Sequence, residues 1–220
     1  GDFTQVNGET HVGTVLIDPA TGQIDPSWTL QARTGTNGGR VSVKSIKVIN
    51  DHIYLGGIFT HFQGNGASWT YARNGARLDI KGKPDRSWNP EFNGTVIDID
   101  VDENEAYYYA AGYFTRAHDR VVENAGRLST AAGAALDQSW TFRHSYLIAK
   151  YQQTVTAANG RVYIGGSQHS LFGYNSDSMT RTSGSITMYN GGDLQASTRS
   201  ATGVVYASCH CSDYTFQDAY

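Results

Sequence analysis

The strongest constraint on the fold is a short stretch that returns along the chain at a nearly regular interval. Residues 53–60 read Ile-Tyr-Leu-Gly-Gly-Ile-Phe-Thr, and we call this pattern the marker motif. It returns, complete or in part, at residues 108–115, 162–166 and 205–209, and residues 1–4 match its final part. The tyrosines at its second position lie 55, 54 and 43 residues apart: Tyr54, Tyr109, Tyr163 and Tyr206. A period of this length is typical of an array of small supersecondary units.

Two further patterns accompany the marker motif in the same order. Asp-x-Ser-Trp occurs at residues 25–28, 85–88 and 137–140, about midway between successive tyrosines. A short segment that is apolar in part lies before each of these tryptophans, at residues 15–18, 76–79 and 126–129. Because the order is kept in three units, the patterns indicate a true structural repeat.

The repeat divides the chain into units of residues 1–56, 57–111, 112–165 and 166–208, with a tail at 209–220. Both ends of the chain fall inside the pattern, so we expect the sequence to belong to a longer protein. In the first unit we expect strands at 12–17, 27–31, 41–49 and 52–55. Hairpin turns are expected at 50–51, 102–105 and 159–160, and Asn-Gly at the last of these strongly favours such a turn.

Units of about 50 residues with four strands each predict an all-β fold, a β-propeller built from four-stranded antiparallel blades. One small sheet cannot cover both of its faces, and stacking the sheets around an axis solves this problem. About four blades are visible. The alternatives are a β-sandwich, whose strands would not recur in the same order, and a solenoid, whose repeats are usually shorter.

The composition agrees with a strand-and-turn protein and limits the partners. The chain has 25 glycines, 14 tyrosines and 17% charged residues. Its net charge of −3 comes without a basic run, so we expect no binding to nucleic acid. No stretch approaches the roughly 20 apolar residues of a membrane helix, so we expect no membrane insertion. Two cysteines are too few for a disulfide framework.

The recurring aromatic residues have a structural explanation. Trp28, Trp88 and Trp140 stand at one place in successive units, which favours packing of each unit against its neighbour. The marker tyrosines lie beside glycines, whose bare backbone accommodates an aromatic ring. We therefore assign both sets to the core.

The best ligand-binding candidates lie outside the repeat. The second unit carries an insertion of about five residues within 63–71, which is rich in glycine and contains Trp69 and Tyr71. Asn65 and Ser68 flank these rings and offer amide and hydroxyl groups, so the four residues suit a sugar or a partner protein. The alternative is that the rings fold over the edge of the propeller.

Two segments resemble metal sites weakly. Cys209 and Cys211 with His210 supply zinc-type ligands, but no second pair stands at the spacing of structural zinc sites. Residues 98–105 have oxygen-bearing side chains at alternate positions, as in calcium loops, yet lack the glycine of the sharp turn. We expect Asp98 and Asp100 to form a solvated strand face, and we expect no cofactor.

No catalytic motif is found, including nucleophile elbows, zinc-protease helices and phosphate-binding loops. Acid pairs of glycosidases can come from distant strands, so a glycan-cleaving enzyme stays a minor alternative. We expect a protein that is not an enzyme.

The marker motif, followed by Leu-Asp and Asp-Pro-Ser-Trp, resembles a β-propeller repeat family of actinobacterial secreted and surface proteins and of actinobacteriophage minor tail proteins. The resemblance covers residues 1–166, whereas the fourth unit lacks Asp-x-Ser-Trp. It implies a non-enzymatic virion protein at the tail tip that contacts other tail proteins, further copies of itself, and glycan or protein of the host envelope. The alternative is a secreted or cell-wall-attached bacterial propeller, outside the cell, that binds carbohydrate or protein.

Overall fold

The computed structural model contains strands and turns. It describes residues 1–35, 39–143, 150–183, 186–187, 192–211 and 215–216, so part of the expected tail lies outside the described residues. No helix occurs in these ranges, and hence none there is long and apolar enough to cross a membrane.

Three antiparallel sheets with the same strand order form the body of the protein. Blade 1 contains β4 (Ser42–Ile49), β5 (His52–Ile58) and β8 (Gly75–Asp79). Blade 2 contains β9 (Val96–Val101), β10 (Tyr107–Gly112) and β13 (Ala125–Ser129). Blade 3 contains β14 (Gln152–Ala158), β15 (Arg161–Gly166) and β16 (Leu171–Asn175). Blade 4 consists of β18 (Leu194–Arg199) and β19 (Val205–Cys209). We call these the inner, marker and outer strands of each blade, in this order.

Short strands form small additional sheets beside the blades. The pairs are β1 (Gln5–Val6) with β2 (Glu9–Thr10), β11 (Arg116–Ala117) with β12 (Arg120–Val121), and β17 (Ile186–Thr187) with β20 (Thr215–Phe216). A small three-stranded sheet contains β3 (Gln31–Arg33), β6 (His61–Gln63) and β7 (Thr70–Tyr71). The β6–β7 hairpin contains the insertion that distinguishes the second unit.

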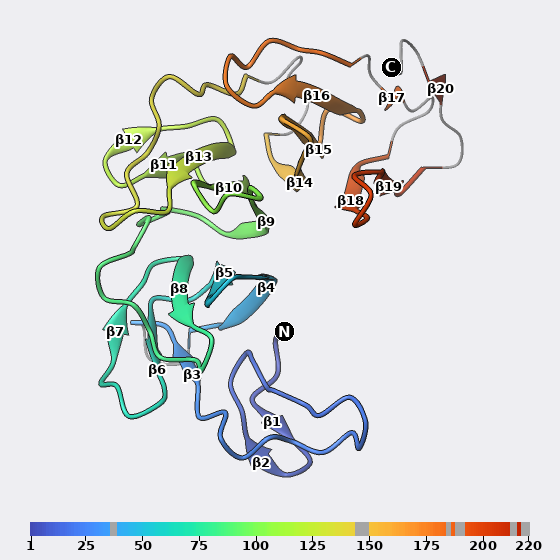
Figure 1. The fold of residues 1–220 in the computed structure, drawn as a ribbon. Helices are drawn as coiled ribbons and strands as arrows, with labels where there is room; N and C mark the ends of the chain where they lie inside the picture. The colour runs from blue at the N-terminus through green and yellow to red at the C-terminus, as the bar shows by residue number, and fades with distance from the viewer. Residues whose placement is uncertain (36–38, 144–149, 184–185, 188–191, 212–214, 217–220) are drawn as a thin grey trace.

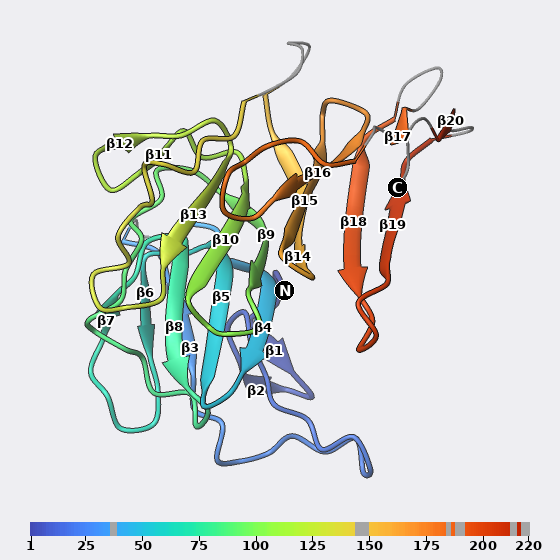
Figure 2. The ribbon, with the colours of Figure 1, turned by 45° about the horizontal axis from the view of Figure 1, so that its top comes forward.

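The blades are arranged as a β-propeller arc. The inner strands β4, β9, β14 and β18 lie side by side around one axis, and the outer strands point away from it (Figure 1). A second view shows the sheets standing next to each other as separate blades (Figure 2). Within the described residues the arc stays open, since no strand of blade 4 pairs with the N-terminal segment. The predicted all-β propeller is confirmed.

The three predicted hairpins are confirmed, but the fourth strand of each blade is reduced. Outside each outer strand a single bridge remains, as between Leu78 and Pro84 and between Leu128 and Leu136. The strands expected at 12–17 and 27–31 are wrong: the first holds only the bridge of Ile17 to Ile24, and β3 begins at Gln31. Residues 12–17 lack a neighbouring marker strand among the described residues, so they have no ladder to join.

Each of the two glycines of the marker motif permits a different close contact of the backbone. A Cβ atom on Gly56 would lie 2.7 Å from Ile99, on the inner strand of the next blade. A Cβ atom on Gly57 would collide with the carbonyl oxygen of Ser42, where β4 bulges against β5. Gly112 faces the carbonyl of Thr95 in the same way. The first glycine therefore lets blades pack, and the second lets the sheet bulge.

The marker tyrosines occupy matching places, opposite Lys47 on β4, Asp100 on β9, Thr156 on β14 and Thr198 on β18. Tyr54 and Tyr109 are buried in the cores between blades, as predicted, and Tyr163 is half-buried. The core assignment is wrong for Tyr206, which is 60% exposed because no described blade follows blade 4.

The recurring tryptophans lie at equivalent points outside the outer strands. Trp88 and Trp140 are buried and Trp28 is half-buried, which confirms their packing role. The Trp88 indole donates to the carbonyl of Ser129 in the next blade at 3.0 Å. Each tryptophan thus packs in the contact between two consecutive units.

Candidate functional site

The small sheet β3–β6–β7 carries an aromatic and cationic face on the outside of blade 1. Arg33 pairs with His61 across β3 and β6, and His61 pairs with Tyr71 across β6 and β7. Directly opposed residues of antiparallel strands point to the same face. Trp69 stands two residues before Tyr71, so it belongs to this face too. We call Arg33, His61, Trp69 and Tyr71 the aromatic face.

Its side chains contact each other in two pairs. The Arg33 guanidinium lies 4.3 Å from the centre of the Trp69 ring, a cation–π distance. The rings of His61 and Tyr71 meet edge to face at 5.3 Å. Tyr71 remains 44% exposed and Trp69 is half-buried. The two aromatic rings are therefore fixed in place while keeping surface in contact with solvent.

The surroundings of His61 favour the neutral form of its ring. Burial and then the positive charge of Arg33 lower the pKa of His61 below its ordinary value. Its Nδ1 lies 2.9 Å from the hydroxyl oxygen of Thr60. Arg33 is consequently the one cation on the face near neutral pH, and it offers several hydrogen-bond donors.

The structure separates the other two predicted ligand residues from the rings. Ser68 accepts a hydrogen bond from Arg86 and lines an open hollow of about 750 Å³ with Gly66 and Ala67. Asn65 is exposed in a turn, and its backbone amide donates to Thr29 Oγ1 at 2.9 Å. Both residues shape the loop that carries Trp69.

Cys209 and Cys211 form a disulfide with each other at the end of β19. Their sulfur atoms are bonded together, so in this structure they are not thiolate ligands beside His210. No group of three or more His, Cys, Asp and Glu side chains suited to a metal ion occurs in the described part of the chain.

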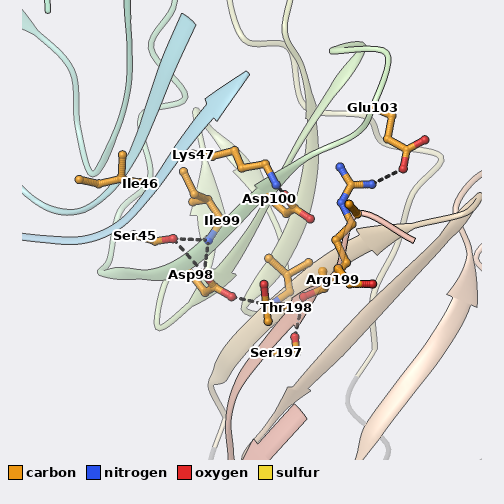
Figure 3. Close-up of a pocket in the computed structure, with 14 residues that line it drawn as sticks. Ser45, Ile46, Lys47, Asp98, Ile99, Asp100, Glu103, Ser197, Thr198 and Arg199 are labelled. Carbon is orange, nitrogen blue, oxygen red and sulfur yellow. Dashed lines mark hydrogen bonds and ion pairs between the residues drawn. The ribbon is translucent and has the colours of Figure 1, made fainter. Parts of the chain in front are cut away.

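A second polar site lies along the axis. A cavity of about 430 Å³ is lined by the inner strands of all four blades (Figure 3). Asp98 projects from β9 and accepts hydrogen bonds from Ser45 Oγ of β4 at 2.9 Å and from Thr154 Oγ1 of β14 at 3.0 Å. The backbone amide of Val155 donates to it at 3.0 Å. Burial raises the pKa of Asp98 above its ordinary value, although these bonds act in the opposite direction.

Asp100 joins the same three blades two residues further along β9. It lies 2.5 Å from Lys47 Nζ of blade 1, and it accepts a hydrogen bond from the Ala157 amide of blade 3 at 2.8 Å. Asp100 is buried. The prediction of a solvated face is therefore wrong for Asp100, because neighbouring inner strands cover it, whereas Asp98 is half-buried and lines the axial cavity.

These carboxylates act as connectors between blades. Their oxygen atoms already accept bonds from amides, hydroxyls and an ammonium group, which fixes them in place. A carboxylate that acts as nucleophile or acid has to reach a substrate atom. We therefore place the candidate binding site on the aromatic face.

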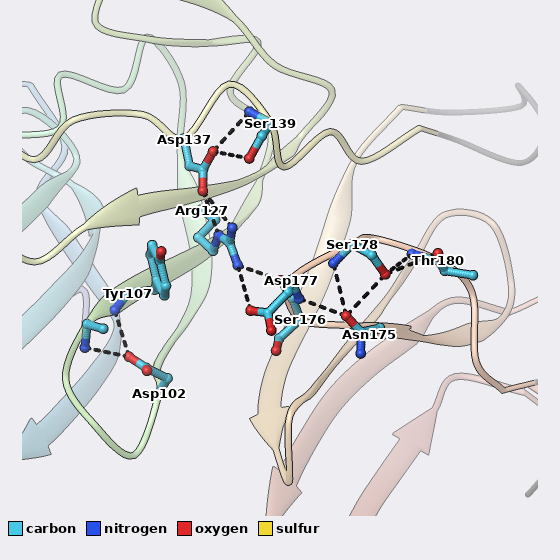
Figure 4. A network of polar contacts seen from close by, with 11 residues as sticks. Asp102, Tyr107, Arg127, Asp137, Ser139, Asn175, Ser176, Asp177, Ser178 and Thr180 are labelled. Carbon is cyan, nitrogen blue, oxygen red and sulfur yellow. Dashed lines mark hydrogen bonds and ion pairs between the residues drawn. The ribbon is translucent and has the colours of Figure 1, made fainter.

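Another buried network has a structural role. Arg127 binds Oδ2 of Asp137 through Nε and Nη2 at 3.1 and 2.6 Å, and Asp137 Oδ1 accepts the amide and hydroxyl of Ser139 (Figure 4). Arg127 also donates to the Ser176 carbonyl of blade 3 at 2.5 Å and lies over the Tyr107 ring. The Asp-x-Ser-Trp motif thus orients an arginine that joins two blades.

Sequence reasoning found the two aromatic residues of the face but missed Arg33. Its place opposite His61 depends on the pairing of β3 with β6, which are separated by the whole inner hairpin of blade 1. The pattern Gln31–Arg33 is too short to predict such a pairing. The only available indication was an arginine in the sequence unit before the one that carries the aromatic insertion.

Comparison with known proteins supports the fold. No family model and no curated protein sequence matches the chain. Among solved structures, it is similar to U3-55K, with a TM-score of 0.51 and 7% identity over 77% of this chain and 45% of that one. It is also similar to the WD40 repeats of RRP9, with a TM-score of 0.50 and 8% identity over 81% of this chain and 56% of that one. The chain spans about half the length of these structures, and at such identities the likeness concerns the propeller fold alone.

Proposed function

We propose that the chain is a non-catalytic binding module that holds a carbohydrate of a bacterial envelope on its aromatic face. What supports the proposal is the contact of Arg33 with Trp69 beside the exposed ring of Tyr71, in a loop outside the repeat. Aromatic rings bind the apolar faces of sugars, and a guanidinium binds hydroxyl or acidic groups at their rims.

The proposed setting is the tail tip of a phage that infects actinobacteria. It rests on the marker motif and on Asp-Pro-Ser-Trp, which resemble repeats of minor tail proteins. Antibodies raised against the chain should then label the tail tips of such particles in electron micrographs. Label on the bacterial wall of uninfected cells would instead favour a secreted or wall-attached propeller.

Binding is tested by incubating the chain with purified envelope glycans from actinobacteria. We expect Trp69→Ala and Tyr71→Ala each to weaken binding about tenfold or more, because each removes a stacking surface. The matched control is Tyr113→Ala, since Tyr113 is 52% exposed and contacts the ring of Tyr151, and both tyrosines lie in the unit 112–165, outside the aromatic face. Titration calorimetry should give the same affinity for this control as for the wild type.

Two results would contradict the proposal. Equal loss of affinity in Tyr71→Ala and Tyr113→Ala would remove the aromatic face from the binding site. Steady release of reducing ends during the incubation would show a glycan-cleaving enzyme in place of a binding module.

A further inference from the structure

The segment that carries the aromatic insertion has a charge balance opposite to that of the rest of the chain. Residues 57–88, from the second glycine of the marker motif to the next recurring tryptophan, contain five Lys and Arg and two Asp and Glu. The remaining residues contain 12 Lys and Arg and 18 Asp and Glu. The formal net charge is therefore +3 for this segment and −6 for the remainder. An anionic ligand is accordingly favoured near this segment and repelled by the charge of the remainder.

Two of these cations lie in the open hollow beside the insertion. Lys83 and Arg86 line it together with Gly66–Ser68 at the tip of the β6–β7 hairpin, and we call it the cationic hollow. Both cationic residues are exposed. Arg86 donates a hydrogen bond to Ser68 Oγ, which holds the guanidinium against the hairpin. In the described part of the chain, no carboxylate lies within ion-pair distance of either cation.

The carboxylates that also line the cationic hollow have other partners. Asp79 Oδ1 accepts the backbone amides of Lys81 and Lys83 at 2.9 Å each, which forms the turn after β8. Asp85 Oδ2 lies 2.6 Å from Nη2 of Arg77, so the charge of this carboxylate is already balanced. The two cations of the hollow are therefore open to an anion from outside the protein.

The aromatic face also has a cation without an acidic partner. Arg33 contacts the Trp69 ring, and no carboxylate of the described residues lies within ion-pair distance of its guanidinium. In the next row of the small sheet Gln31 pairs with Gln63, which adds neutral amide groups beside the rings. The described side chains of this face therefore offer a positive charge and hydrogen-bonding groups to a ligand, and no negative charge.

The tip of the β6–β7 hairpin connects the aromatic face with the cationic hollow. Ser68 lines the hollow and binds Arg86. Trp69, the next residue, belongs to the face and contacts the Arg33 guanidinium. Because the Cα atoms of adjacent residues are about 3.8 Å apart, the two sites begin within one residue of each other. A ligand of several sugar residues can therefore contact both.

We propose that the glycan of the aromatic face is acidic, and that its chain continues over the hairpin tip so that its negative groups bind Lys83 and Arg86. This inference rests on the proposed function of the aromatic face. The rings hold the apolar faces of sugar residues. Arg33 and Arg86 can each bind a carboxylate or a phosphate through two parallel hydrogen bonds, and Lys83 adds a point charge. Sugar acids and phosphodiester-linked sugars share this chemistry.

The test uses purified envelope glycan from actinobacteria, separated by anion exchange into a neutral and an acidic pool. Titration calorimetry of the wild-type chain should show about tenfold or more tighter binding of the acidic pool. Raising the sodium chloride concentration from about 50 to about 500 mM should weaken this binding and leave that of the neutral pool nearly unchanged. Reduction of carboxylates to alcohols abolishes the preference if the ligand is a sugar acid, and cleavage with hydrofluoric acid abolishes it if the ligand is a phosphodiester.

Neutral substitutions separate the cationic hollow from the rings. Lys83→Gln combined with Arg86→Gln should weaken binding of the acidic pool about tenfold or more, and should leave binding of the neutral pool unchanged. The matched control is Lys81→Gln, since Lys81 is exposed on the same turn but does not line the hollow. Arg86→Lys keeps the charge and should bind the acidic pool more tightly than Arg86→Gln. Circular dichroism of every variant separates loss of the contact from loss of the fold.

The outcomes distinguish this inference from the proposed function. Equal affinity for the two pools, or a loss in Lys81→Gln as large as in the double variant, would overturn the inference, while a loss in Trp69→Ala would still support the aromatic face. Absence of binding to both pools, or binding insensitive to Trp69→Ala, would overturn the proposed function and the inference with it. Tighter binding of single-stranded DNA than of the acidic pool would assign the cations to nucleic acid and overturn the inference.

Discussion

The aspartate of Asp-x-Ser-Trp shows how one side chain can connect local and long-range structure. Asp85 Oδ1 accepts the amide and hydroxyl of Ser87 at 2.8 and 2.7 Å, which forms the turn. Its Oδ2 accepts Nε and Nη2 of Arg77 at 2.9 and 2.6 Å, and Arg77 donates onward to the Thr130 carbonyl of blade 2. A polar residue thus recurs in the repeat because the blade contact depends on it.

This arrangement predicts how stability depends on pH. Burial alone would raise the pKa of Asp85, but the bonds from Ser87 and Arg77 lower it below its ordinary value of 3.8. A lowered folded-state pKa stabilises the fold above the unfolded-state pKa, and this contribution is lost as pH falls through the folded-state value. Asp85→Asn should be less stable at pH 7 and lose less stability on acidification below pH 4. Urea denaturation at a series of pH values measures both; parallel curves for the two proteins would contradict the prediction.

The two kinds of tryptophan should respond differently to truncation. Trp88 is fully buried among the aromatic rings of blades 1 and 2, so Trp88→Ala should cost about 3–5 kcal/mol of unfolding free energy. Trp69 is half-buried on the aromatic face, and Trp69→Ala should cost clearly less while weakening binding. Denaturant titration compares them, and equal losses would remove the distinction between core and site.

At the scale of elements, the glycine pair sets the distance between strands and between blades. Gly112→Ala places a methyl group against the carbonyl of Thr95 and should destabilise the protein by about 1–3 kcal/mol. The control is Gly126→Ala in the same blade, where the nearest atom lies at 3.6 Å and the backbone needs no left-handed conformation. Thermal melting should show a lower midpoint for the first variant and little change for the second.

The repeat pattern predicts the elements that are determined by their own residues. It does not predict the elements that form by pairing of strands far apart in the sequence. The inner hairpins follow from their turn residues, such as Asn159 and Gly160, which adopt positive φ angles of 52° and 70°. The small sheet could not be predicted, because Arg33 and His61 come together through β3, which has only three residues. Tertiary packing decides such short strands.

At the scale of the whole molecule, the axis is held by polar contacts as well as by apolar ones. The alternation of apolar residues with Asp98 and Asp100 does predict a strand with two different faces. The sequence of one strand does not show that neighbouring strands lie against both of these faces. Only the fan of inner strands places β4 and β14 on either side of β9. Exposure of Tyr206 is likewise a property of the arc, since its sequence context matches that of Tyr54.

We expect Asp98→Ala to weaken the contacts among three blades at once. The substitution leaves the hydroxyls of Ser45 and Thr154 and the amide of Val155 without their acceptor, which should cost about 1–3 kcal/mol. Hydrogen exchange should show faster exchange at the Val155 amide of β14. Protection equal to the wild type at that amide would mean that Asp98 does not connect the blades.

The aromatic face is assembled from two consecutive repeats, since Arg33 precedes the inner hairpin of blade 1 and Trp69 and Tyr71 follow it. Duplication or recombination of one unit, cut at the marker motif, would therefore separate the cation from the rings. Transfer of the proposed binding site to another propeller requires a segment that begins before residue 31 and ends after residue 71. The segment that holds the aromatic face is thus offset from the unit of folding.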